Sequence, residues 1–145
     1  MNDDTLFLPG LSPVERHDIH ARFDGGALSS DGGVLLLCEI ERGMDFADML
    51  ASCLQDERNP GRTTLIRERI FAIACGYEDC DDLDALRHDP AFRIACERLP
   101  DSGPALASQP TLSRLENTPS WRDLARMGLK LIDLFAPALG RLRAT

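Results

Sequence analysis

The side chains best suited to chemistry lie in residues 107–117, which read ASQPTLSRLEN. Ser108 or Gln109 can cap a helix here, and Pro110 fits its first turn, where a missing N–H costs no hydrogen bond. Two leucines three residues apart then give the helix one apolar face. Its other face carries groups that can bind phosphate oxygens or base edges of DNA, and it can equally be an ordinary solvated surface. These candidate DNA-binding residues are Gln109, Thr111, Ser113, Arg114 and Asn117.

A longer amphipathic helix is predicted over residues 119–135, directly after this stretch. Pro119 is expected in its first turn, apolar side chains recur along it at helical spacing, and Pro137 is expected to end it. A short helix, a turn and a longer helix are compatible with a helix-turn-helix near residues 108–135, and equally with an ordinary αα-hairpin. Three basic side chains of the longer helix are candidate phosphate contacts: Arg122, Arg126 and Lys130.

The balance of charge changes sign along the chain. Its net charge of −8 counts against DNA binding, because phosphate contacts need Lys and Arg. Residues 1–60 hold 12 acidic and 4 basic side chains, residues 61–100 hold 8 and 6, and residues 101–145 hold 4 and 6. Any DNA-facing surface is therefore expected in the last third of the chain.

Other side chains that could react or bind a metal form no complete motif. The five cysteines contain no CxxC pair, and their apolar neighbours predict buried, reduced thiols. His17 and His20 lie three residues apart without the further ligands of a zinc site. The acidic run at 78–84 lacks the glycine and the late glutamate of an EF-hand and is better explained as the first turn of a short helix. We therefore expect no metal or cofactor to bind this chain.

The elements that position these residues are predicted to be mainly helical, with one small exception. The alternating pattern at 19–23 and the Asp-Gly-Gly turn after it predict a β-hairpin near residues 17–29, preceded by a flexible arm at 1–16. An isolated two-stranded ribbon is marginally stable, so the hairpin must pack on the helices that follow it.

Caps and apolar spacing predict five helices ahead of residue 100. Gly43 is expected to end the first, and Asp89 with Pro90 is expected to open the last. In the third helix, Glu68 falls on the predicted outer face and Ile73 on the inner face. The five helices are predicted over residues 34–43, 46–54, 62–77, a short stretch ending near His88, and 91–99.

The length of 145 residues suits a single domain. One helical domain is expected over 17–136 with a tail at 137–145, and the polar segment 55–61 is the best candidate for an internal boundary. The sequence has no apolar run long enough to cross a membrane, and its N-terminus lacks the features of a signal peptide, so a cytoplasmic protein is expected.

Three separated stretches of the chain resemble the N-terminal region of bacterial DDE-type insertion-sequence transposases. They read FDGGALSSDGG at 23–33, FAIACGYEDCDDLDALRHDPAF at 71–92 and ASQPTLSRLEN at 107–117. They occur in the same order as in the family, and the resemblance spans residues 19–135. It implies a protein of DNA transposition and recombination that binds the inverted repeats at the ends of its element.

The same resemblance implies a later ribonuclease-H-like domain, in which Asp, Asp and Glu hold a divalent metal such as Mg²⁺. In the family, the first catalytic Asp lies on a strand after a helix that resembles 119–135. The sequence ends here with APALGRLRAT, so none of the family's catalytic carboxylates can be placed on a residue of this chain. No nucleophile or phosphate-loop motif indicates a separate enzyme either.

Two functions are therefore expected. The first is sequence-specific binding of terminal inverted repeats by the N-terminal portion of a transposase, which would be associated with the nucleoid when bound to DNA. The alternative is a non-catalytic, truncated remnant that acts as a helical protein-interaction module or modulates an intact transposase. The expected partners are DNA, a full-length transposase and a second copy of the chain.

Overall fold

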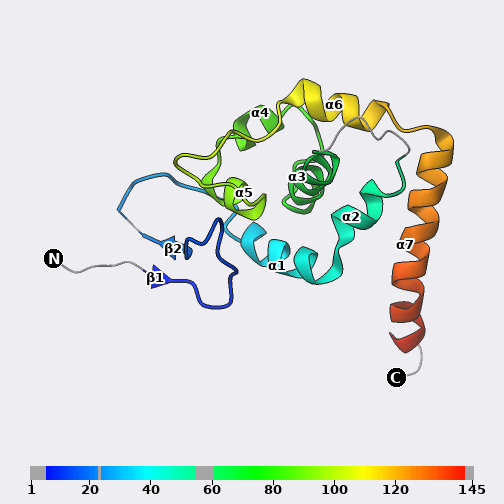
Figure 1. Ribbon diagram of the computed structural model, residues 1–145, viewed down its shortest axis with the longest axis horizontal. Helices are drawn as coiled ribbons and strands as arrows, with labels where there is room; N and C mark the ends of the chain where they lie inside the picture. Colours follow the sequence, from blue (N-terminus) through cyan, green and yellow to red (C-terminus); the bar gives the residue numbers. More distant parts are fainter. Residues whose placement is uncertain (1–5, 23, 55–60, 143–145) are drawn as a thin grey trace.

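Helices make up most of the described chain, and one of them lies at the centre. The computed structural model describes residues 6–22, 24–54 and 61–142. Figure 1 shows α3 end-on, with the other helices arranged around it. The prediction of a mainly helical fold is confirmed. The helices are α1 (Val34–Met44), α2 (Phe46–Ala51), α3 (Arg62–Ala74), α4 (Leu83–Leu86), α5 (Pro90–Ala95), α6 (Gln109–Asn117) and α7 (Trp121–Leu142).

The main hydrophobic core joins five of these helices, α1, α3, α4, α5 and α6. A second, smaller cluster lies between α2 and α3, where Leu50 and Ile66 are buried, and α7 packs onto it through Met127 and Leu131. Helix α6 is therefore anchored in the main core, whereas α7 is attached along one side through α2. The largest fully buried side chains of the main core come from α1, α3, α5 and α6, and they are Val34, Phe71, Phe92 and Leu112.

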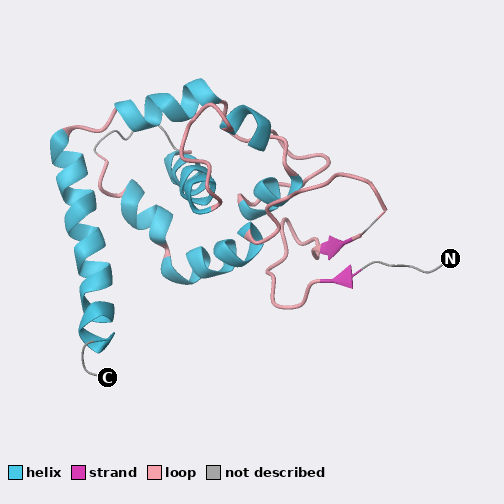
Figure 2. Ribbon diagram, turned by 180° about the vertical axis from the view of Figure 1, so that it is seen from behind, coloured by secondary structure: helices cyan, strands magenta, loops and turns pink. Residues whose placement is uncertain are grey.

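The β-hairpin predicted near residues 17–29 is wrong in its pairing. Strand β2 (His20–Ala21) pairs in antiparallel fashion with β1 (Leu6–Phe7), and residues 27–29 form no strand. Figure 2 shows the two short strands beside one another, outside the ring of helices. The Asp-Gly-Gly sequence predicts a local turn but does not determine which segment pairs with β2. The segment that does pair with it, β1, precedes β2 in the chain, whereas the predicted partner follows it. Phe23, at the end of the predicted first strand, lies outside the described residues.

Parts of the segment predicted as a flexible arm at 1–16 contact the rest of the molecule. Val14 is buried and forms an isolated bridge with His17. The Ser12 N–H and hydroxyl each donate a hydrogen bond of 2.8 Å to the carboxylate of Glu39 on α1. Residues 1–5 of this predicted arm, and 55–60 of the predicted boundary segment, lie outside the described residues.

The predicted start of α5 agrees with the structure, but the helix ends at Ala95 and not at the predicted Leu99, and the predicted end of α1 also differs. Asp89 accepts a hydrogen bond of 3.0 Å from the Phe92 N–H, so the predicted cap of α5 is confirmed. Helix α1 continues through Gly43 and ends at Met44, and its C-cap residue Asp45 takes the left-handed conformation with φ of 48°. Asp45 provides no side-chain cap for α2, because Glu41 of α1 accepts the N–H of Ala47 instead, at 3.1 Å.

The buried face of α3 is rotated from the predicted one. Glu68, predicted on the outer face, is 3% exposed, whereas Ile73 is 52% exposed. Because α3 is enclosed by other helices, it lacks the single solvated face that an amphipathic pattern assumes. A charged side chain is tolerated at such a position when charged or hydrogen-bonding partners surround it.

Helix α7 extends further than predicted. It runs from Trp121 to Leu142 with Pro137 inside it, so the prediction that Pro137 ends the helix is wrong. Proline removes one backbone donor, but it does not prevent the turns on either side from forming. The predicted tail at 137–145 is therefore helical up to Leu142, and 143–145 lie outside the described residues. No described helix combines the length and the apolar character that crossing a membrane requires.

Candidate nucleic-acid interface

Helix α6 turns one face to the core and the opposite face outward, as its pattern predicts. Leu112 is 1% exposed, and the partly buried Leu115 packs against both clusters of buried residues. On the opposite side, Arg114 and Asn117 are exposed. The core thus fixes the rotation of α6 about its axis, and with it the direction in which the polar side chains point.

The start of α6 is held by carboxylates from two other helices. Asp84 of α4 accepts a hydrogen bond of 3.0 Å from the Gln109 N–H. Just ahead of the helix, Glu68 of α3 accepts the Ala107 N–H at 2.9 Å. Ser108 occupies the N-cap position, but its side chain makes no capping bond. The two acids satisfy N–H groups that secondary structure leaves unpaired here, so they fix the point where α6 begins.

Glu68 is a buried acid with a cation beside it. Arg98 Nη2 lies 3.2 Å from Glu68 Oε1, which is an ion-pair distance without the alignment of a hydrogen bond. Burial raises the pKa of the Glu68 carboxyl above its ordinary value, and the Ala107 hydrogen bond and the Arg98 charge oppose that effect. Sequence reasoning missed the roles of Glu68 and Asp84, because neither has a local signal that links it to a helix start far along the chain.

The turn between α6 and α7 is closed on both sides. The Thr118 hydroxyl donates to the Arg114 carbonyl at 2.5 Å at the end of α6. The Ser120 N–H donates to Asp123 Oδ2 at 2.8 Å, and the Asp123 N–H donates to Ser120 Oγ at 3.3 Å. This reciprocal arrangement is a capping box, whose Ser-x-x-Asp spacing is visible in the sequence. The corner where α6 meets α7, at the upper right of Figure 1, therefore has a defined geometry.

One flank of α6 borders an acidic hollow. Within it, Arg69 is held by an ion pair with Glu116 and by the carbonyls of Tyr77 and Glu78. Because the carboxylates outnumber the cations there, this flank repels a phosphate backbone. Gln109 of the predicted site lies on this side. The hollow has a volume of about 440 Å³ and is lined by Arg69, Glu78, Asp79, Cys80, Gln109, Ser113 and Glu116.

The opposite flank of α6 and part of α7 carry cations without acidic partners. Arg114 follows Ser113 by one residue, so its side chain leaves the helix about 100° away from the side of the hollow. Arg114, Arg122 and Lys130 are exposed, and none of the three forms an ion pair within the part of the chain that the structure describes. The Arg122 guanidinium carbon lies 5.3 Å from the centre of the Trp121 ring, a cation–π distance.

The other predicted contacts, Arg126, Thr111 and Asn117, each have a hydrogen-bond partner inside the protein. Arg126 donates to the Cys53 carbonyl through Nε at 3.0 Å and Nη2 at 2.8 Å, and it also pairs with Asp123. These bonds attach α7 to the end of α2. Thr111 is half-buried, with its hydroxyl 3.1 Å from that of Ser108. The side-chain amide of Asn117 donates to the carbonyl of Ser113 at 2.8 Å, although Asn117 itself is exposed.

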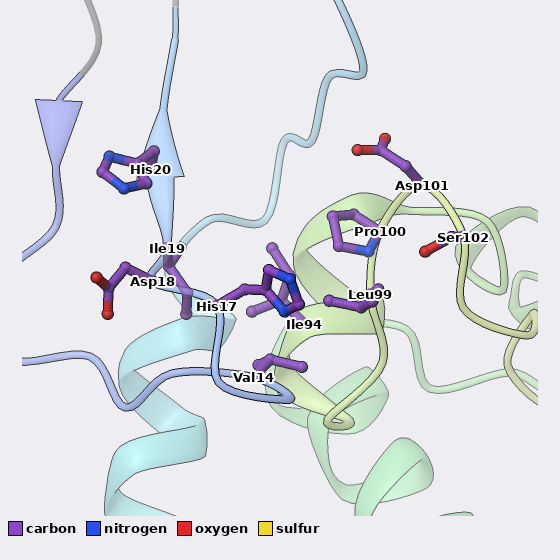
Figure 3. A pocket seen from close by; sticks show the side chains of 10 residues that line it. All are labelled: Val14, His17, Asp18, Ile19, His20, Ile94, Leu99, Pro100, Asp101 and Ser102. Atoms are coloured by element: carbon purple, nitrogen blue, oxygen red, sulfur yellow. The ribbon is translucent and has the colours of Figure 1, made fainter.

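A second hollow, of about 370 Å³, lies between the N-terminal segment and the loop after α5. Figure 3 shows its apolar residues Ile94 and Leu99 beside the His17 ring, with the His20 ring turned away from His17. The two histidines are therefore not brought together at one site. Asp18 and Asp101 stand at the edges of this hollow, so it is poorly suited to phosphate.

Within residues 6–22, 24–54 and 61–142, no group of three or more His, Cys, Asp or Glu side chains is placed to hold a metal ion. The five cysteines are free thiols, four of them buried and Cys75 partly exposed. Of the candidate sites described above, the exposed residues of α6 and α7 are therefore the best placed to bind a partner. We call this surface the basic edge; it consists of Arg114, Asn117, Arg122 and Lys130.

Comparison with protein families gives one match that covers almost the whole chain. The family model described as "Transposase DDE domain group 1" matches residues 11–142. Neither the curated proteins nor the solved structures contain a match to the chain.

Proposed function

The chain belongs to the transposase DDE domain group 1 family, so its function is related to DNA transposition. From this premise we propose that the chain binds the terminal inverted repeats of an insertion sequence. The exposed basic edge of α6 and α7 would make the contacts. Arg114 and Asn117 would approach base edges or phosphates from the end of α6, while Arg122 and Lys130 would contact the backbone from α7. When bound to DNA, the protein would be associated with the nucleoid.

The observation that carries this proposal is a contrast between the arginines on α1, α3 and α5, which have partners inside the protein, and the exposed cations of α6 and α7. Arg42, Arg67 and Arg69 are each paired with a glutamate, and Arg93 donates to backbone carbonyls. The cations of the basic edge have no such acidic partner within the described residues. Exposed cations without acidic partners can exchange counterions for phosphates, which is the main source of affinity for DNA.

The rigid corner between α6 and α7 supports the same proposal. A protein that reads a particular sequence must present its side chains in a fixed geometry. The Ser120–Asp123 capping box and the Arg126 bonds to Cys53 hold α7 against the rest of the molecule. Both α6 and the first turns of α7 are therefore placed before DNA arrives, so that little ordering has to accompany binding.

The test is a comparison of arginine variants in a fluorescence-anisotropy titration with a duplex that carries the terminal repeat. Arg114→Ala is expected to weaken binding by about 1–3 kcal/mol if it contacts a base, and Arg122→Ala to lower the salt slope by about 1 for one lost phosphate contact. Arg22→Ala is the matched control, because it removes the same charge from an exposed position directly after β2, a strand that lies far from α7 in Figure 1. Equal effects of all three variants would refute the proposed edge.

A second candidate function is a protein-interaction module that pairs with an intact transposase or with another copy of the chain. It is favoured by the exposed apolar side chains of α7, which a DNA-binding edge alone does not explain. Co-purification of the chain with an intact transposase, abolished by an arginine on the apolar face of α7 such as Leu124→Arg, would support it. Repeat binding without any protein partner would favour the first function.

A further inference from the structure

Trp121, the one tryptophan of the sequence, lies exposed beside the basic edge. It is the first residue of α7, and so stands at the corner where α6 meets α7 (Figure 1). The residue is 72% exposed, although tryptophan usually hides most of its surface in a folded protein. Tryptophan and arginine are the side chains that most often dominate the energy of binding sites. The exposed pair of Trp121 and Arg122 therefore indicates a place where a ligand binds.

One face of the Trp121 ring is covered and the other is open. The Arg122 guanidinium carbon lies 5.3 Å from the ring centre, so the cation covers one face. The side of α7 that packs on the protein is marked by Met127, six residues on and therefore about 120° around the helix axis from Trp121. Because the residue is still 72% exposed with Arg122 over one face, the opposite face of the indole ring is accessible to a flat partner.

The backbone that carries this ring is fixed by the capping box. The Ser120 N–H donates to Asp123 at 2.8 Å, and the Asp123 N–H donates back to Ser120 Oγ at 3.3 Å. Trp121 lies between these two residues, so the direction in which its side chain leaves the helix is set before any ligand arrives. A ring held in this way loses little conformational entropy when a partner stacks on it.

The charges around the ring favour a nucleotide over an apolar protein surface. Glu116 and Asp123 are each paired with an arginine of the protein. Arg114 and Arg122 are exposed and have no ion pair among the residues that the structure describes. An apolar partner would have to desolvate these two guanidinium groups without supplying an opposite charge, which is costly. A nucleotide supplies both a flat face for the indole ring and a phosphate for the arginines.

We propose that the corner between α6 and α7 binds DNA with unpaired bases, and that one base stacks on the open face of Trp121. This inference rests on the proposed function, because it names the form of DNA that the basic edge prefers. Every nucleobase has a π-face, so an aromatic ring within a positively charged surface binds single strands with little regard to their sequence. Along a blunt duplex, neighbouring base pairs cover these faces, and Trp121 has no base to stack on.

Tryptophan emission tests the proposal directly, since the single tryptophan reports on Trp121 alone. Three probes are compared: a single-stranded oligonucleotide, a blunt duplex of the same sequence, and an abasic strand of the same length. The single strand is expected to quench the emission. The duplex and the abasic strand are expected to leave it nearly unchanged, because the duplex offers no open base face along its length and the abasic strand offers charge without bases.

Variants of the ring separate stacking from charge. Trp121→Ala is expected to raise the dissociation constant for the single strand by about fivefold or more, the effect of one lost stacked base. The same variant should leave the constant for the blunt duplex within about twofold, because the phosphate contacts remain. Trp121→Phe keeps a ring and should retain most of the affinity for the single strand. Leu129→Ala is the matched control, since Leu129 is 63% exposed and apolar but lies about two turns further along α7.

Fluorescence anisotropy measures these constants, and circular dichroism checks that each variant is folded. The proposal is overturned if the single strand does not quench the emission, or if the abasic strand quenches it equally. It is also overturned if Trp121→Ala weakens single strand and duplex alike, or if Leu129→Ala has the same effect as Trp121→Ala.

The same probes distinguish a failure of this inference from a failure of the proposed function. Preferential binding of the repeat duplex, with unchanged emission for every probe, would leave repeat recognition standing and overturn the stacking proposal. Quenching by the single strand without any preference for the repeat duplex would support stacking on Trp121 and contradict repeat recognition.

Discussion

The buried carboxylate of Glu68 is predicted to hold α6 in place, and its removal is the sharpest test of how this fold positions the basic edge. Glu68 is 3% exposed, accepts the Ala107 N–H and lies beside Arg98. Glu68→Ala leaves the N–H without an acceptor and the cation without its partner. Breaking a buried pair in this way costs about 3–5 kcal/mol. Glu68→Gln keeps an acceptor oxygen, so it is expected to cost about 1–3 kcal/mol.

Urea unfolding followed by circular dichroism measures both changes in the free energy of unfolding, and thermal unfolding measures the accompanying change in Tm. With a shift of about 2–4 °C per kcal/mol for a chain of this size, Glu68→Ala is expected to lower Tm by about 10 °C. Glu78→Ala is the control, because it removes an exposed glutamate and should change stability by less than about 0.5 kcal/mol. Hydrogen exchange at the first turn of α6 should also accelerate in Glu68→Ala. Equal stability of Glu68→Ala and the wild type would refute the role of this carboxylate.

The pKa of Glu68 adds a pH dependence of defined sign. Because burial raises the pKa of this carboxyl in the folded state, the native protein holds its proton more tightly than the unfolded chain does. The contribution of Glu68 to stability is therefore largest in acid, below its unfolded pKa, and is lost as the pH rises through the folded pKa. The advantage of the wild type over Glu68→Gln should be larger at pH 5 than at pH 8. An advantage that grows with pH would show that Arg98 outweighs the effect of burial.

Three further predictions concern the core, the corner and the thiols. Leu112→Ala opens a cavity under α6 and is expected to reduce the free energy of unfolding by about 2–5 kcal/mol, as measured in urea. Ser120→Ala removes half of the capping box and should cost about 1 kcal/mol in the same assay, with no loss expected for Ser102→Ala in an exposed loop. Burial raises the pKa of the Cys96 thiol well above its ordinary value. At pH 8, Ellman's reagent should therefore react first with the partly exposed Cys75 and reach all five thiols after unfolding. Rapid reaction of Cys96 in the native protein would contradict its burial.

Local signals in the sequence were sufficient for most of the helices. Asp89 and Pro90 mark the start of α5 because a cap and a first-turn proline act within three residues of one another. Helix α6 was predicted for the same reason. The pairing of β1 with β2 could not be predicted in this way, since it depends on contacts between residues that no turn connects. Pro137 failed as an end signal because a long helix can continue past a proline.

The predicted DNA-binding residues show that residue type alone does not predict whether a side chain is free to contact DNA. Arg114, Arg122 and Arg126 look alike in the sequence, yet Arg126 is bound to the Cys53 carbonyl 73 residues away. Glu68 shows the opposite case, because the helical pattern places it outside and the enclosure of α3 buries it. Both outcomes are set by tertiary contacts. Whether the remaining cations bind DNA stays a prediction.

The most direct measurement is a fluorescence-anisotropy titration of the chain with a duplex carrying the terminal inverted repeat of the neighbouring element, beside a scrambled duplex of the same length, at two salt concentrations. We predict tighter binding to the repeat, weakened by salt in proportion to the number of phosphate contacts. Equal binding to both duplexes, or no binding to either, would contradict recognition of transposon ends by α6 and α7.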